Sequence, residues 1–140
     1  MQQRPFSAAQ QRLTEAGLRL TKQRLALGRL LFEGPDRHVT AESIHEEAQS
    51  AGIRVSLATV YNTLHQFTDA GLLRQVIIGG GKVYFDTNTT DHHHFHMAGD
   101  DRLIDIPGVN IDVSGLPEAP EGTEIDRVDV IVRLKGDPPA

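Results

Sequence analysis

A dense run of histidines lies just past the middle of this 140-residue chain, in the segment Asp91-His92-His93-His94-Phe95-His96. It holds four of the seven histidines in the sequence. Imidazole is the most common transition-metal ligand near neutral pH, so the run predicts a metal or haem site. In a β-strand, alternation would place His92, His94 and His96 on one face. A fortuitous histidine-rich loop or an adventitious nickel site is the alternative, because such a tract is only a compositional cue.

The chain has no cysteine, which excludes disulfides, thiolate zinc sites and cysteine nucleophiles. Any metal must therefore be held by imidazole and carboxylate, a donor set that suits zinc, iron, manganese, nickel or copper. No apolar run approaches the length of a membrane span, and the N-terminus lacks a signal pattern. We therefore expect a cytoplasmic protein without a membrane partner.

Charge is distributed unevenly along the chain. Residues 1–90 carry ten Lys and Arg against eight Asp and Glu, whereas residues 91–140 carry four against eleven. The basic surplus is sharpest in residues 1–35, with six basic and two acidic residues. This asymmetry predicts a phosphate-facing N-terminal part and an acidic part suited to cations.

Four helices are predicted in the first half from their start and stop signals, over residues 7–17, 21–34, 40–52 and 56–71. The last of them has a predicted buried stripe formed by Leu57, Val60, Leu64 and Phe67. Two β-prone runs, residues 73–78 and 82–85, flank a glycine loop and predict a hairpin. Short helices followed by a hairpin have the outline of a winged helix-turn-helix, with the fourth helix as the DNA reader.

Beyond residue 91 the pattern changes to short strands, predicted at residues 95–98, 103–106 and 128–134, around a loop rich in Pro and Gly. The predicted fold class is therefore α+β. A winged-helix DNA-binding domain at residues 1–85 is followed by a hinge at residues 86–91 and a small strand-rich α/β domain at residues 92–140.

The outer face of the predicted reading helix carries polar side chains, namely Ser56, Thr59, Tyr61, Asn62, Thr63 and Gln66. Asn and Gln can make bidentate contacts to adenine, and hydroxyl groups can bond phosphate. Basic residues that precede it, where the first helices would approach the DNA backbone, are Arg19, Lys22 and Arg24. By itself this helix is also consistent with an ordinary amphipathic helix. The hairpin and the basic N-terminal third favour DNA binding. The residues predicted to contact DNA are Arg19, Lys22, Arg24, Ser56, Thr59, Tyr61, Asn62 and Thr63.

Four motifs, taken in order, resemble the DNA-binding half of the ferric uptake regulator family: GLRLTKQR at 17–24, HVTAESI at 38–44, SLATVYNTL at 56–64 and AGL at 70–72. The similarity continues through the histidine run to Asp105-Ile106-Pro107. Asn62 in place of the usual arginine, together with residues 91–95 and 103–107, resembles the iron response regulator branch. This resemblance implies a homodimeric regulator of iron and haem genes that binds an AT-rich palindromic operator and whose hold on DNA is weakened when haem binds. It also implies that residues 92–140 form the dimerisation and metal- or haem-sensing domain.

The resemblance also implies site residues. The family's regulatory site for Fe²⁺, Mn²⁺ or Zn²⁺ falls on His38, Asp86, His92, His94 and Asp105. A second metal site, where the similarity weakens, falls on Asp91, His93, Asp112 and Asp129. The haem-ligand candidates are His92, His93 and His94. His38 has the alternative of a plain loop histidine before a helix cap, and His96 that of a spare ligand or a surface residue.

Two departures from the family pattern matter. The Cys-X-X-Cys pairs that hold structural zinc in many relatives are absent, with Met97 and Asp100 at the positions of the first pair, so no structural zinc held by four cysteines is expected. The Cys-Pro haem motif of some iron response regulators is absent too. Haem control must therefore rest on histidine. His45 and His65 are interpreted as structural or surface residues.

Three other functions compete with the haem-responsive regulator. One is a metal-activated repressor of the same family without a haem response. Another is a metalloenzyme, because a His/Asp cluster can hold a catalytic metal with an open position, although no general base or substrate pocket can be nominated. The third is a metal-buffering module, which leaves the basic N-terminal part unexplained.

Overall fold

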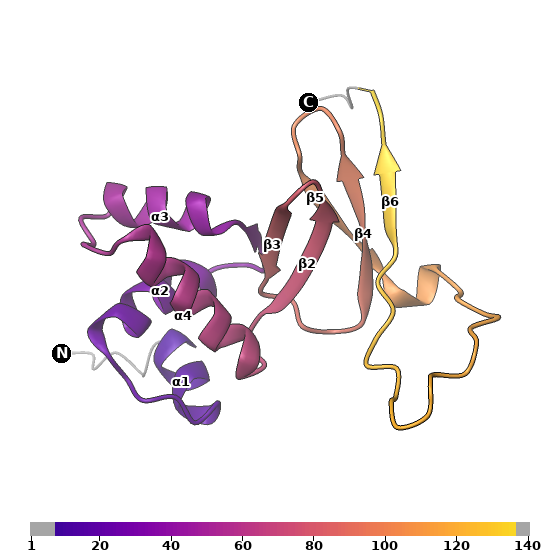
Figure 1. Cartoon of the computed structure of the whole chain (residues 1–140). Helices are drawn as coiled ribbons and strands as arrows, with labels where there is room; N and C mark the ends of the chain where they lie inside the picture. Colours follow the sequence, from indigo (N-terminus) through magenta and orange to yellow (C-terminus); the bar gives the residue numbers. More distant parts are fainter. Residues whose placement is uncertain (1–7, 137–140) are drawn as a thin grey trace. The chain divides into compact units, whose positions relative to one another are not determined.

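The computed structural model describes residues 8–136 and divides them into two compact units, with the boundary between Thr89 and Thr90 (Figure 1). The first unit contains α1 (Ala8–Glu15), α2 (Lys22–Phe32), β1 (His38–Val39), α3 (Ala41–Ser50), α4 (Leu57–Asp69), β2 (Arg74–Gly79) and β3 (Lys82–Asp86). The second contains β4 (His92–Met97), β5 (Leu103–Pro107), the short 3-10 helix η1 (Gly108–Asn110) and β6 (Ile131–Leu134). The predicted α+β class is confirmed.

Hydroxyl side chains begin the helices of the first unit. Thr40 and Ser43 form a reciprocal capping box at α3, in which each hydroxyl oxygen accepts the backbone N–H of the other residue at 3.0 Å. The predicted starts that the structure confirms are Thr21, Thr40 and Ser56. Ser7, predicted as the first cap, lies outside the described residues. None of the described helices is long and apolar enough to cross a membrane.

The end of α4 is set by Gly71, whose φ of +82° lies in the left-handed region. The N–H of Leu72 donates to the Phe67 carbonyl at 2.8 Å, and the N–H of Gly71 donates to the Thr68 carbonyl at 3.0 Å. These two bonds form a Schellman cap. Because a side chain at this φ is strained, glycine determines where α4 stops and the chain turns toward β2.

The buried face of α4 differs from the prediction at two positions. Val60, Leu64 and Phe67 are fully buried, as predicted. Leu57 is 36% exposed, because it is the first residue of α4 and extends past the core. Thr63 is only 5% exposed, so its predicted place on the solvent face is wrong. Residues three apart share one face of a helix, so Thr63 lies on the buried side of α4 with Val60 and beside Leu64.

The wing is a three-stranded antiparallel sheet in the order β1-β3-β2. The predicted hairpin of β2 and β3 is present, and its turn contains Gly79, Gly80 and Gly81, all with positive φ. The strand β1 was not predicted. It pairs His38 with Asp86, so His38 is a strand residue and not a loop histidine.

The second unit is a three-stranded sheet in the order β5-β4-β6, with β4 antiparallel to β5 and parallel to β6. β4 begins at His92, three residues before its predicted start, so it contains the whole histidine run. β6 begins at Ile131 and not at residue 128. The Val130 N–H is bound by a side chain, His93, where a strand would continue its ladder. Residues 111–130 form neither helix nor strand.

Candidate metal centre and nucleic-acid interface

The predicted alternation of the histidines is confirmed in β4. His92, His94 and His96 are buried, whereas His93 is half-buried on the other face. The antiparallel register places Asp105 of β5 opposite His94. One carboxylate oxygen, Asp105 Oδ1, lies 3.4 Å from His92 Nε2 and 3.5 Å from His94 Nε2. The second unit therefore directs two imidazole nitrogens at one carboxylate.

A backbone contact determines the tautomer of His92. Its Nδ1 lies 2.6 Å from the Thr90 carbonyl oxygen, which can only accept a hydrogen bond, so Nδ1 carries a proton. In neutral His92 the Nε2 lone pair then faces the Asp105 carboxylate. Two electron-rich groups in this arrangement are stabilised by a cation between them. Donation of the other ring N–H to a carbonyl is the usual arrangement of a metal-bound histidine.

The first unit has a similar pair. His38 Nε2 lies 3.2 Å from Asp86 Oδ2 across the β1–β3 register. Asp86 is fully buried, and its Oδ1 accepts the Asn88 N–H at 2.9 Å. A buried carboxylate is costly unless it is paired with a cation or hydrogen-bonded, and both oxygens of Asp86 have such contacts.

The second predicted metal set is not gathered. Asp91 and Asp112 are exposed, and Asp129 accepts from Arg127 at 3.0 Å. His93 Nδ1 accepts the Val130 N–H at 3.0 Å, which leaves the proton of neutral His93 on Nε2. Neither nitrogen of His93 then offers a lone pair to a metal. Within residues 8–136, no group of three candidate ligands includes any of these four residues.

His96 is neither a surface residue nor a neighbour of Asp105 in the way that His92 and His94 are. It is 7% exposed, and its Nε2 lies 3.2 Å from Asp101 Oδ1 in the β4–β5 turn. Asp101 adopts a positive φ of 58°, an αL conformation that short polar side chains tolerate. The pair therefore closes the turn.

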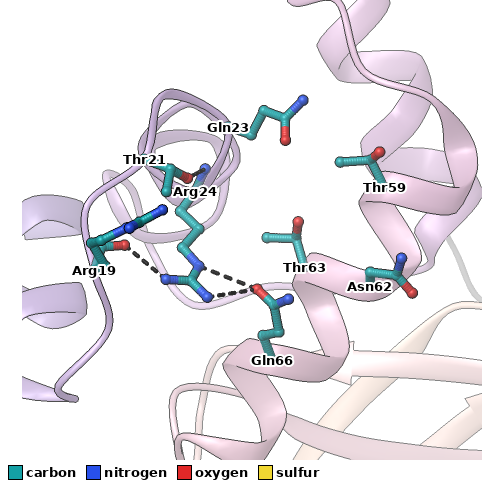
Figure 2. Close-up of a pocket in the computed structure, with 8 residues that line it drawn as sticks. All are labelled: Arg19, Thr21, Gln23, Arg24, Thr59, Asn62, Thr63 and Gln66. Atoms are coloured by element: carbon teal, nitrogen blue, oxygen red, sulfur yellow. Dashed lines mark hydrogen bonds between the residues drawn. The ribbon is translucent and has the colours of Figure 1, made fainter.

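On the first unit, a cleft of about 570 Å³ lies between the N-terminal end of α2 and the outer side of α4 (Figure 2). Its lining residues are Arg19, Thr21, Gln23, Arg24, Thr59, Asn62, Thr63 and Gln66. Five of the eight predicted DNA contacts are among them. The other three are Lys22, Ser56 and Tyr61.

Those three residues have other surroundings. Lys22 is exposed at the start of α2, and Ser56 caps α4 by accepting the Thr59 N–H at 3.1 Å. The Tyr61 hydroxyl donates to Glu42 Oε1 of α3 at 2.6 Å. This hydrogen bond, followed by burial and the Glu42 charge, raises the pKa of Tyr61 above its ordinary value. Tyr61 therefore links the two helices of the helix-turn-helix.

The sequence profile of the ferric uptake regulator family matches residues 15–116. The chain belongs to the ferric uptake regulator family. A ferric uptake regulation protein of Shigella flexneri is 41% identical over 85 residues, which make up 61% of this chain and 57% of that protein. The match therefore spans little more than half the length of this curated relative.

Solved structures of the family have the same fold. The ferric uptake regulator from Pseudomonas aeruginosa, determined with manganese, has a TM-score of 0.69 at 25% identity and covers 93% of this chain and 98% of its own. The Vibrio cholerae ferric uptake regulator has a TM-score of 0.69 at 24% identity, with 90% and 98% covered. A winged helix followed by a strand-rich unit is thus the architecture shared with the ferric uptake regulator family.

Three groups that shape these sites are not marked by any pattern in the sequence. The Thr90 carbonyl is a backbone atom, which no residue type marks. Glu42 and Gln66 are common polar residues whose partners, Tyr61 and Arg24, are distant in the sequence. Gln66 was placed on the outer face of α4 but not among the DNA-binding residues.

Proposed function

We propose that this protein is a dimeric, cytoplasmic transcription regulator whose affinity for duplex DNA depends on a bound divalent metal. The observation that carries the proposal is the α2–α4 cleft, in which a guanidinium group and the Asn62 amide line the outer side of a winged-helix reader. A homodimer would present two copies of α4 to the two halves of an AT-rich palindrome. Membership of a family of regulators leaves the metalloenzyme alternative without support.

We propose one regulatory metal site, held by His38, Asp86, His92, His94 and Asp105. Support comes from each unit taken separately. The first offers an imidazole 3.2 Å from a buried carboxylate, and the second offers two imidazoles that share one carboxylate oxygen. Such a mixed N/O donor set suits Fe²⁺, Mn²⁺ or Zn²⁺. The manganese in the Pseudomonas aeruginosa structure is consistent with this set. When bound, the metal would supply a cross-link between the two units.

The protein's own residues position both the metal ligand and the DNA-binding helix. The Thr90 carbonyl fixes the ring of His92, so its Nε2 offers a lone pair to a metal without rearrangement. The α4 helix is anchored by Phe67 and capped at both ends, so its outer side is presented rigidly. Because half-site spacing is geometric, constraining two copies of α4 changes the affinity for the operator.

Asn62→Ala is expected to reduce the preference for operator over random duplex by about 5- to 150-fold, the value of one bidentate base contact. Asn62 is exposed on α4 and lines the cleft. Competition binding with both duplexes measures the ratio. Asn110→Ala, an exposed asparagine of the second unit, is the matched control. An equal loss on both duplexes would remove Asn62 from the base contacts, because phosphate contacts do not discriminate.

We further propose the finer assignment to the iron response regulator branch, with haem weakening the hold on DNA. The haem candidates are His92, His93 and His94. His93 faces away from the donors of the metal site, but its Nδ1 is occupied by the Val130 N–H. Haem ligation by His93 would therefore require a change of tautomer or loss of this bond beside β6.

The test is fluorescence anisotropy of a labelled AT-rich palindromic duplex with metal-free protein, then with Mn²⁺, then with haem added. Metal-dependent, sequence-preferring binding supports the regulator, and its reversal by haem supports the finer assignment. Binding that requires Mn²⁺ and ignores haem leaves a metal-activated repressor. Metal uptake without duplex binding under any condition contradicts the proposal and favours the buffering module.

A further inference from the structure

We propose that the cleft between α2 and α4 seats one phosphodiester of the DNA backbone, with Arg24 as the contacting cation and Gln66 as the residue that positions it. This inference rests on the proposed DNA-binding function. It specifies that the group in the cleft is one backbone phosphodiester. It also assigns to Gln66 the role of positioning Arg24.

The Arg24 side chain is held in place by three hydrogen bonds to two acceptor atoms. Its Nε and Nη2 both donate to Gln66 Oε1 at 3.1 Å, and its Nη1 donates to the Arg19 carbonyl at 2.8 Å (Figure 2). A guanidinium group has five N–H donors, so two remain for a ligand. Holding a long side chain in advance removes part of the entropy cost of binding.

The charge of Arg24 is oriented but not neutralised. Gln66 Oε1 and the Arg19 carbonyl are both neutral acceptors. No carboxylate within residues 8–136 forms an ion pair with Arg24, whereas Arg37 of the same unit is paired with Glu47. A fixed guanidinium with two donors left and no counter-ion is suited to a phosphodiester, which accepts two parallel N–H bonds.

A second group points into the same cleft. Thr63 is only 5% exposed, yet it lines the cleft, and Figure 2 shows its hydroxyl directed into the open space. Among the residues that the structure describes, this hydroxyl has no hydrogen-bond partner. The N-terminal turn of the 11-residue helix α2 borders the cleft as well and favours an anion there. Asn62 on the same lining places the site beside the reading face, which favours backbone phosphate over a free anion.

The salt dependence of duplex binding tests the proposal, because each neutralised phosphate contributes about 0.9 to the slope of log affinity against log salt. Arg24→Gln is expected to lower the slope by about one and to weaken operator and random duplexes alike.

Gln66→Glu keeps the acceptor oxygen but neutralises the charge of Arg24, so the same fall in slope is expected. Gln66→Leu frees the side chain without changing charge and lowers affinity at an unchanged slope. Arg29→Gln, an exposed arginine of α2 outside the cleft, is the matched control and keeps the wild-type slope.

Thr63→Val removes the hydroxyl with little change in shape and is expected to weaken both duplexes alike, with an unchanged melting temperature. If Arg24→Gln and Gln66→Glu keep the wild-type slope and only lower the melting temperature, the contact is structural and the proposal fails. It also fails if inorganic phosphate binds wild-type but not Arg24→Gln protein and leaves duplex binding unchanged at constant ionic strength, because the occupant is then a free anion. Wild-type protein that binds no duplex contradicts the proposed function itself.

Discussion

Replacing both His92 and His94 with alanine is expected to lower the affinity for Mn²⁺ by more than about 100-fold and to abolish the metal response of DNA binding. Loss of one outer partner of a metal ligand costs about 10- to 100-fold, so loss of two direct donors should exceed that range. Both nitrogens lie within 3.5 Å of Asp105 Oδ1, and both side chains are buried. Calorimetric titration with Mn²⁺ measures the affinity, and anisotropy measures the response.

Further variants distinguish a loss of metal binding from a loss of folding. Two buried alanines can loosen the second sheet, so Asp105→Asn is the second variant, because it removes the charge with almost no change in volume. Its side chain is 35% exposed, so little packing is lost. His45→Ala with His65→Ala removes two histidines of the first unit and is expected to leave the Mn²⁺ affinity unchanged. A wild-type metal affinity and DNA response in the His92 and His94 double variant would refute the site.

Phe67→Ala is expected to lower the free energy of unfolding of the first unit by about 3–5 kcal/mol, the usual cost of removing a buried phenyl ring. Phe67 is fully buried in the core, and its ring centroid lies 5.8 Å from that of Phe32. Since small domains have about 5–15 kcal/mol in total, this loss removes a large share of the stability. Urea unfolding followed by circular dichroism measures it, and duplex binding should fall in parallel.

Leu57→Ala is the matched control for Phe67→Ala. Leu57 belongs to the same helix and to the same stripe predicted from the sequence, but it is 36% exposed. The expected change is within about 0.5 kcal/mol, as for other surface substitutions. If Leu57→Ala destabilised the first unit as much as Phe67→Ala does, the sequence periodicity would be right and the observed burial of α4 wrong.

Local patterns in the sequence were sufficient for much of the fold. The caps at Thr21, Thr40 and Ser56, the glycine end of α4 and the hairpin turn all depend on residues within a few positions of one another. Alternation alone predicted that, in a strand, His92 and His94 share one face and His93 lies on the other. These features follow from backbone geometry, which repeats every 2 or 3.6 residues whatever the rest of the chain does.

The tertiary structure decided the partners. It paired His38 with Asp86 through a two-residue strand that no pattern marks, and it joined Arg24 to Gln66 across 42 positions of sequence. It also turned His93 toward the Val130 N–H. It buried Thr63 and left Leu57 exposed, whereas periodicity alone had predicted the reverse. The physical reason is the same in each case. A residue's own type and spacing set the face of the element on which it lies, whereas its contacts depend on which other surfaces pack against that face, and those surfaces are distant in the sequence.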